Sequence, residues 1–307
     1  MTQQPLVSVV IPAYNHGDYL DAAISSVLAQ DYSRVELIVI DDGSTDDTKA
    51  VLKKYAGQFH FESQANAGQV ATLNKGWQMS RGEILAYLSA DDLLMPTAVT
   101  RAVACLGKNS DAVLVYCDFN LVDPHSQVVR RVTTADFDYA TMVSELLCYP
   151  GPGAFFRRSA FEKAGTWDRQ FRQMPDFEYW LRLGLHGRFV RIPEVLAAFR
   201  VHPGSLTFSS QNPDESVRII EQYFARADLP AEIRALESRA AGNACLLGAQ
   251  LHFRAGSYRR GVASLRQAFL LNRANFFKPM LIRRLANALF NRIGHRLLWN
   301  IKKRLGR

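Results

Sequence analysis

The segment Val7-Ser-Val-Val-Ile-Pro-Ala-Tyr-Asn15 decides the fold, because a run of β-branched residues stops abruptly at a proline. Val7–Ile11 predicts a buried strand, and Pro12–Asn15 ends it. Asp18 can cap a helix that runs to about Gln30 with one apolar side. Val35–Ile40 then predicts a second buried strand. A strand, a helix and a strand in this order indicate a parallel pair joined by a crossover.

The same alternation continues along the chain. A helix that begins at Ser44 precedes a short strand at Phe59–Glu62, and a further helix extends through Trp77. Strands at Ile84–Leu88 and Ala112–Phe119 follow. This order predicts the α/β class, with a mostly parallel sheet flanked by helices.

Polar clusters follow three of the predicted strands. They are Pro12–Asn15, Asp41–Ser44 and Ser89–Asp92. One such cluster would be explained by turns and helix caps, which use Asp, Asn, Ser and Gly. Three clusters at the carboxyl ends of strands favour a ligand site, because open α/β sheets bind their ligands at that edge.

The two aspartate pairs suggest different tasks. Asp91-Asp92 would repel each other without a cation or hydrogen-bond donors, and carboxylates with phosphates are usual ligands of hard divalent ions. A helix cap before Pro96 is the simpler explanation, but it accounts for one Asp only. Asp41-Asp42 could accept hydrogen bonds from a base or ribose. The chain contains no P-loop and no GxGxxG at its first helix, so any nucleotide is held in another way.

Four motifs together resemble the family 2 glycosyltransferases of GT-A fold, and the resemblance covers about residues 6–205. The motifs are Val7–Asn15, Val39-Ile-Asp-Asp-Gly-Ser-Thr-Asp46, Asn66-x-Gly68 with Asn74-x-Gly76, and Leu88-Ser-Ala-Asp-Asp92. The resemblance implies a nucleoside-diphosphate sugar donor, for which we expect UDP, a Mn²⁺ or Mg²⁺ cofactor, and inversion at the anomeric carbon.

The resemblance also implies site residues. Pro12 and Tyr14 would border the nucleoside, and Asp42 would read the base with Asp41 beside it. Asn66 and Gly68 would belong to the donor site. Asp91 would lie near the ribose, and Asp92 would bind the metal against the diphosphate. Many members carry an acid where this chain has Ser89, which predicts a lower metal affinity.

The second half of the chain supplies further candidates. In the family that the chain resembles, an acidic residue before a Trp-containing helix is the catalytic base, and Asp176 is the nearest match. A base is needed because the acceptor hydroxyl must lose a proton during direct displacement. A helix cap after Pro175 is the alternative for Asp176. Glu178 is the weaker base candidate. His202 follows an apolar strand and could bind the metal or the diphosphate, or be a solvated loop residue.

Composition narrows the class of protein. The chain has 307 residues, a formal charge of +8 and 48% hydrophobic residues, which fits a globular protein. Its four cysteines form no CxxC pair, so we expect neither a disulfide framework nor a cysteine zinc site. We also expect no spanning helix and no secretory signal, because no apolar stretch is long enough and no basic region precedes one.

Charge divides the chain unevenly. Residues 238–307 contain 15 Lys or Arg and no Asp or Glu. We predict a catalytic domain at 1–210 and a helical extension at 211–307 that ends in a basic amphipathic tail at 276–307. The tail fits an anionic membrane surface, so we expect a cytoplasmic protein bound to the inner face of the membrane. A helix docked on the body is the alternative, and we expect no nucleic-acid partner.

These observations leave three functional hypotheses. The first is a metal-dependent inverting glycosyltransferase that acts on a glycan or a lipid-linked acceptor in surface polysaccharide assembly. The second is a non-catalytic nucleotide- or carbohydrate-binding protein with the same fold, which Ser89 alone favours. The third is a sugar nucleotidyltransferase, against which the missing basic glycine-rich loop after the first strand argues.

Overall fold

The computed structural model describes residues 4–202 and 212–273. These residues fall into two compact units. The first contains residues 4–139 and 148–202, and the second contains residues 140–147 and 212–273. The predicted division at residue 210 lies outside the described residues. The segment 140–147, which the prediction placed in the first domain, groups with the second unit.

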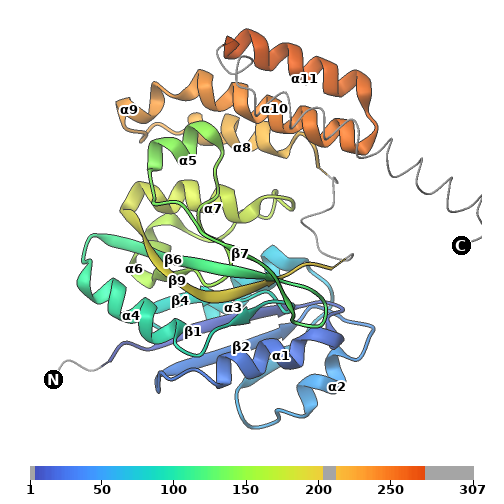
Figure 1. Cartoon of the computed structure of the whole chain (residues 1–307), viewed down its shortest axis with the longest axis vertical. Helices are drawn as coiled ribbons and strands as arrows, with labels where there is room; N and C mark the ends of the chain where they lie inside the picture. The colour runs from blue at the N-terminus through green and yellow to red at the C-terminus, as the bar shows by residue number, and fades with distance from the viewer. Residues whose placement is uncertain (1–3, 203–211, 274–307) are drawn as a thin grey trace, which may run out of the picture. The chain divides into compact units, whose positions relative to one another are not determined.

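Within residues 4–202, nine strands form one mixed sheet with the order β3-β2-β1-β4-β8-β6-β9-β5, and β7 pairs with β6 (Figure 1). The strands are β1 (Val7–Ala13), β2 (Val35–Asp41), β3 (His60–Ser63), β4 (Ile84–Tyr87), β5 (Leu93–Leu94), β6 (Ala112–Val122), β7 (Val128–Val132), β8 (Phe155–Arg157) and β9 (Arg188–Arg200). Strands β3, β2, β1 and β4 are mutually parallel, and β9 is parallel to β6. Strand β8 runs antiparallel between β4 and β6. The predicted α/β class, with a sheet flanked by helices, is confirmed, and the sheet is parallel at β3-β2-β1-β4 and mixed beyond β4.

Helices connect and cover the strands of this unit. They are α1 (Gly17–Leu28), α2 (Thr48–Lys53), α3 (Gln69–Met79), α4 (Ala98–Lys108), α6 (Arg158–Ala164) and α7 (Pro175–Leu183), with a 3₁₀ turn η1 at Gly184–His186. The first helix starts at Gly17, two residues before the start that a cap at Asp18 would give, and the second starts at Thr48 rather than at Ser44.

Strand β1 is buried along its whole length, because helices pack on both faces of the sheet. Val9 and Ile11 belong to a core cluster with residues of α1 and α4. Val10 points to the other face, where α3 approaches so closely that a Cβ on Gly76 would lie 2.3 Å from its Cγ1 atom. Glycine at position 76 therefore brings α3 onto the centre of the sheet.

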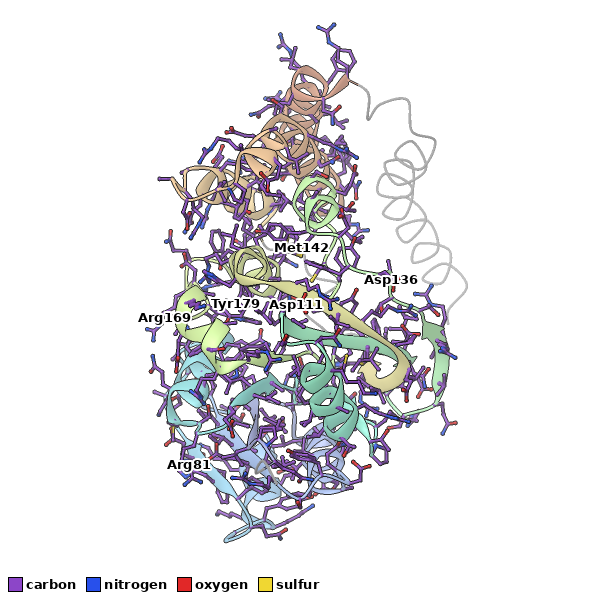
Figure 2. The ribbon with its side chains drawn as sticks, turned by 90° about the vertical axis from the view of Figure 1, so that its left-hand side faces the viewer. Arg81, Asp111, Asp136, Met142, Arg169 and Tyr179 are labelled. Atoms are coloured by element: carbon purple, nitrogen blue, oxygen red, sulfur yellow. The ribbon has the colours of Figure 1, made fainter. Side chains whose placement is uncertain are left out.

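The α3 face of the sheet continues into a cluster of aromatic side chains. Trp77 of α3 lies edge-on to Phe156 of β8, with ring centroids 5.4 Å apart, and donates its indole N–H to the carbonyl of Ala86. Tyr179, which Figure 2 labels, and Trp180 of α7 complete the cluster and are buried. This packing holds α7 against the sheet.

The described residues of the second unit form helices. Its helices are α5 (Tyr139–Glu145), α8 (Glu215–Phe224), α9 (Ala231–Arg234), α10 (Glu237–Ala255) and α11 (Tyr258–Leu271). Arg239 of α10 binds Glu145, and the Asn243 amide donates to the carbonyl of Ser144 at 2.6 Å. These contacts explain why α5 groups with helices that lie far along the chain.

The predicted basic tail at 276–307 lies outside the described residues. Across residues 4–202 and 212–273, no helix has both the length and the hydropathy that a membrane crossing requires.

Candidate active site

Two loops at the carboxyl edge of the sheet are tied together: the loop after β1 and the loop after β2. Asn15 has a left-handed backbone (φ 54°) and donates its N–H to Ser44 Oγ at 2.9 Å. The side-chain oxygen of Asn15 accepts the N–H of Thr45 at 2.9 Å. Asn is one of the residues that tolerates this conformation, and the hydrogen bonds stabilise it. The first two polar clusters of the sequence therefore form one structure.

The start of helix α1 depends on the same contact between loops. His16 occupies the cap position and makes no side-chain cap bond. The first N–H of the helix, on Gly17, donates instead to Asp46 Oδ2 at 2.9 Å. Burial alone would raise the pKa of Asp46, but hydrogen bonds from Thr48 and Gly17 outweigh it and lower that pKa. The prediction that Asp18 caps the helix was wrong, because Asp18 lies in the first turn.

The adjacent carboxylates Asp41 and Asp42 have separate environments. The oxygens of Asp42 accept the backbone N–H groups of Ala67 and Gly68, both at 2.8 Å, and the side-chain amide of Gln64. Asp41 is fully buried and accepts the N–H of Ser44 through Oδ1. Its Oδ2 atom has no hydrogen-bond partner among the described residues. A buried carboxylate oxygen without a donor is costly, which is typical of an oxygen that a ligand satisfies.

The other residues predicted for the donor site lie at the same edge. Pro12 is buried within β1 opposite Ile40, and Tyr14 is 46% exposed just beyond the strand. Asn66 and Gly68 are exposed in the loop that Asp42 holds. Thus the structure brings these positions together around one strand edge.

Asp91 and His202 form the polar centre of the candidate site. Asp91 Oδ2 lies 3.0 Å from His202 Nε2 and 4.0 Å from Nε2 of His16. Ligand atoms of these three residues lie within 4.8 Å of one another, and all three side chains are partly buried. Donors at about 2.1 Å from one ion lie roughly 3–4 Å apart. The residues present therefore fit a divalent cation with small adjustments.

Asp92 lies outside this cluster, although the sequence assigned the metal to it and the ribose to Asp91. Its side chain is 3% exposed, and Oδ1 accepts the N–H of Arg200 at 2.9 Å. Burial raises the pKa of Asp92 well above its usual range, and the neighbouring Asp91 carboxylate raises it further. The hydrogen bond from the Arg200 N–H lowers this pKa but does not outweigh them. In this geometry Asp91 faces His202, while Asp92 anchors the end of β9.

Arg200 holds the turn that carries both aspartates, a role that the sequence did not reveal. Its buried guanidinium donates to the carbonyls of Asp91, Asp123 and Pro124 at 2.8–3.1 Å. The same group lies over the ring of Tyr19 at 4.9 Å. A buried arginine needs such partners, so the turn after β4 is fixed by β9 and by the β6–β7 connection.

Asp176 lies in the first turn of α7 and accepts the N–H of Phe177 at 2.8 Å. Loss of solvation, and then the charge of Asp176, raises the pKa of Tyr87, the last residue of β4. Asp176 is therefore within electrostatic reach of the strand that leads to Asp91.

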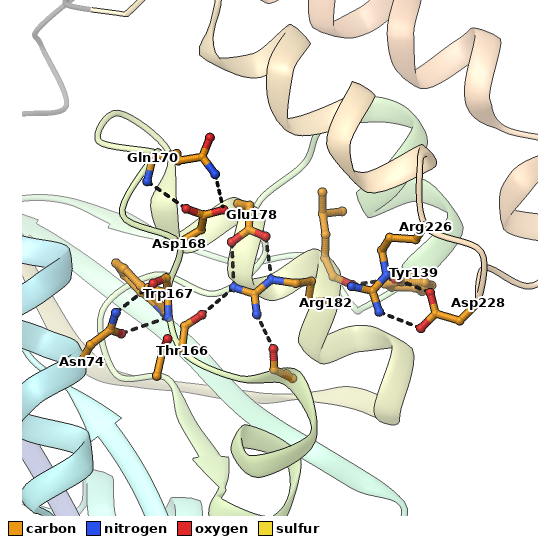
Figure 3. Close-up of polar contacts among 12 residues, drawn as sticks. Asn74, Tyr139, Thr166, Trp167, Asp168, Gln170, Glu178, Arg182, Arg226 and Asp228 are labelled. Atoms are coloured by element: carbon orange, nitrogen blue, oxygen red, sulfur yellow. Dashed lines mark hydrogen bonds and ion pairs between the residues drawn. The ribbon is translucent and has the colours of Figure 1, made fainter.

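Glu178 has a structural role, in keeping with the weaker prediction for it. Both of its carboxylate oxygens bind Arg182 at 2.6 and 2.8 Å, and Arg182 also donates to the carbonyl of Thr166 (Figure 3). Beside this pair, Asn74 and Trp167 exchange two hydrogen bonds between α3 and the segment that precedes α7. The Glu178 carboxylate is therefore committed to the ion pair with Arg182.

Comparison with known proteins identifies the fold and the family. The model of glycosyl transferase family 2 matches residues 8–165. An uncharacterized glycosyltransferase of Rickettsia typhi is 30% identical over 233 residues, which cover 73% of this chain and 71% of the relative. A chondroitin synthase of Escherichia coli is 28% identical over 62% of this chain and 28% of its own length.

Solved structures share the fold. S. aureus TarS 1-349 in complex with UDP-GlcNAc aligns over 98% of this chain and 92% of its own, with a TM-score of 0.68 and 15% identity. A mannosyltransferase of Pyrobaculum calidifontis in complex with GDP-Man and Mn²⁺ aligns over 95% and 88%, with a TM-score of 0.62 and 17% identity. The fold is thus that of GT-A glycosyltransferases. On the match of the family model and the similarity to curated relatives, the chain belongs to glycosyl transferase family 2.

Proposed function

We propose that this protein is a metal-dependent inverting glycosyltransferase that uses a nucleoside-diphosphate sugar, with UDP as the expected nucleotide. The acceptor is a hydroxyl of a glycan or a lipid-linked saccharide, in the assembly of a surface polysaccharide. The observation that carries the proposal is the convergence of Asp91 and His202 at the strand edge where Asp41 and Tyr14 also lie. The complexes of TarS and of the Pyrobaculum enzyme with nucleotide sugars support the donor class.

On the donor side, we assign base recognition to Asp41 rather than to Asp42. The Asp42 carboxylate already binds two backbone N–H groups and one amide, whereas Oδ2 of Asp41 is buried and has no donor in the described part of the chain. An N–H of the base would satisfy that oxygen. The exposed ring of Tyr14 is available to stack against the nucleoside. Asp42 instead shapes the loop that carries Asn66 and Gly68.

On the diphosphate side, we assign the metal to Asp91 and His202 rather than to Asp92. A bound Mn²⁺ or Mg²⁺ would neutralise the charge that develops on the departing diphosphate. Asp92 and Arg200 would hold Asp91 in position through the N–H and guanidinium contacts.

Asp176 is the proposed base on the acceptor side. The acceptor oxygen bonds to the anomeric carbon while the carbon–oxygen bond to the diphosphate breaks, and the diphosphate takes that electron pair. The hydroxyl proton passes to the Asp176 carboxylate. One displacement from the opposite face inverts the anomeric centre, so no nucleophilic side chain is needed.

Thermal unfolding with a panel of nucleoside diphosphates, with and without Mn²⁺, tests the donor assignment. A ligand at 100 times its Kd stabilises the folded state by about 2.7 kcal/mol, which raises the midpoint by roughly 5–10 °C for a domain of this size. We expect one nucleotide to dominate and Mn²⁺ to enlarge its shift. The Asp41→Asn variant should lose about tenfold or more in affinity for that nucleotide.

Two outcomes would count against the proposal. No shift with any nucleotide would contradict the donor class. Donor binding without transfer to a broad panel of acceptors would favour the non-catalytic alternative, to which Ser89 in the Asp91-Asp92 motif points.

We further propose that the tail at 276–307 binds an anionic membrane surface on the cytoplasmic side. Its sequence combines apolar residues with a high density of Lys and Arg and has no acidic residue. Removal of residues 276–307 should move the protein from vesicles of phosphatidylglycerol into the supernatant, and the full chain should leave those vesicles at high salt. Equal partition of both forms would refute this assignment.

A further inference from the structure

His16 breaks a local rule of helix structure. The cap position of α1 would normally carry Ser, Thr, Asp or Asn, whose side chain accepts an N–H of the first turn. His16 occupies this position and makes no such bond, and Asp46 from the next loop receives the Gly17 N–H in its place. The start of the helix therefore does not depend on the His16 imidazole.

The backbone at His16 is held by hydrogen bonds on both its N–H and its carbonyl group. The His16 N–H donates to Thr48 Oγ1 at 3.2 Å, and its carbonyl accepts the N–H groups of Tyr19 and Leu20 at 3.0 and 2.9 Å. Asn15, immediately before it, is held in the left-handed region by Ser44 and Thr45. Unusual backbone conformations that neighbouring groups hold in place cluster at functional sites.

The His16 imidazole is directed at the candidate metal centre. Its Nε2 atom lies 4.0 Å from Asp91 Oδ2, the oxygen that also lies 3.0 Å from His202 Nε2. The two imidazole rings are nearly perpendicular, with centroids 6.2 Å apart, so they approach the carboxylate from different directions. Two imidazoles from distant parts of the chain thus converge on one oxygen.

We propose that His16 is a third protein ligand of the metal, and that the resulting His–Asp–His set selects a first-row transition ion such as Mn²⁺ over Mg²⁺. This inference rests on the metal site of the proposed function and adds to it a ligand and a preference. Imidazole nitrogen suits transition ions, whereas Mg²⁺ prefers oxygen ligands and keeps its waters. Two imidazoles beside one carboxylate therefore discriminate against Mg²⁺.

The alternative role for His16 is a hydrogen bond to the donor diphosphate. Measurement of Mn²⁺ binding in the absence of nucleotide distinguishes a metal ligand from a diphosphate contact. The probe is Mn²⁺, whose free signal is followed by electron paramagnetic resonance on the full chain, with Mg²⁺ measured by competition. We expect His16→Ala to weaken Mn²⁺ binding by about tenfold or more, because even outer partners of metal ligands change affinity by roughly 10–100-fold. Mg²⁺ affinity should change by less than about threefold, so the Mn²⁺ over Mg²⁺ preference should fall.

His60→Ala is the matched control, because His60 is exposed on β3 and pairs with Glu62 outside this cluster. His16→Gln is measured beside His16→Ala, and circular dichroism confirms that each variant is folded.

Unchanged Mn²⁺ affinity in both folded variants would overturn the proposal. No Mn²⁺ binding by the unaltered protein, with or without a nucleoside diphosphate, would also overturn it. A loss seen only with the diphosphate present would also overturn it in favour of the phosphate contact. Loss of Mn²⁺ affinity in a protein that binds no nucleotide would uphold the third ligand and refute the proposed function.

Discussion

Asp91→Asn should lower sugar transfer by on the order of 10³-fold and remove Mn²⁺ stimulation. The Asp91 carboxylate is the shared partner of His202 and His16, and an amide keeps its size while losing the negative charge that a divalent ion requires. Loss of the metal's stabilisation of the departing diphosphate is worth several kcal/mol, and about 4 kcal/mol corresponds to that factor. Release of nucleoside diphosphate in the presence of donor and acceptor measures the effect.

Asp111→Asn is a suitable control for this variant, because Asp111 forms an exposed ion pair with Arg188 away from the site. Its transfer rate should match that of the unaltered protein. Asp92→Asn separates the two neighbouring carboxyl groups. If it removed Mn²⁺ binding while Asp91→Asn retained it, the assignment of the metal to Asp91 would be wrong.

Asp176→Asn should reduce kcat by roughly 10²–10⁴-fold while donor binding stays unchanged. The expected loss is that of a general base, because an amide cannot take the proton of the acceptor hydroxyl. The nucleotide-induced shift in thermal midpoint should be the same as in the unaltered protein, since Asp176 lies on α7 and not at the nucleotide edge. Steady-state kinetics and the thermal assay together test both parts of this prediction.

Glu178→Gln provides the contrast within the same helix. The Glu178–Arg182 pair is buried, so removal of one charge should cost about 3 kcal/mol in free energy of unfolding. The folded fraction should keep its kcat. A large fall in kcat for Glu178→Gln with full activity in Asp176→Asn would transfer the catalytic role to Glu178.

The sheet could be predicted from the sequence because each central strand is a continuous apolar run with a clear end. Val35–Ile40 was expected and β2 spans Val35–Asp41, with Leu37–Asp41 buried and Glu36 as a polar residue near the start of the strand. Helix starts were less predictable. The caps of α1 and α2 depend on Asp46, whose contacts join two loops, and local pattern alone favoured Asp18 and Ser44.

The sequence predicted a candidate site at a strand edge, and the predicted donor-site residues lie at one such edge in the structure, but the sequence did not distinguish the contacts of the two residues in each aspartate pair. Adjacent residues at a strand end point in opposite directions, so the contacts of each carboxylate follow from the fold and not from the local sequence. Asp41 Oδ2 is buried without a donor among the described residues, while Asp42 accepts the N–H groups of Ala67 and Gly68. His16 was missed because its significance depends on Asp91 and His202, which lie far away in the chain.

The hydrogen bonds between the loops after β1 and β2 have a consequence for protein engineering. Asn15, His16 and Gly17 each use a partner in the segment 44–48. A Cβ on Gly43 would lie 2.8 Å from the backbone nitrogen of Asn66, so a third loop is fitted to the second. In chimeras with relatives that differ in donor preference, these loops must be exchanged as one cassette. A transplanted single loop would leave its neighbour without the donors and acceptors that shape it.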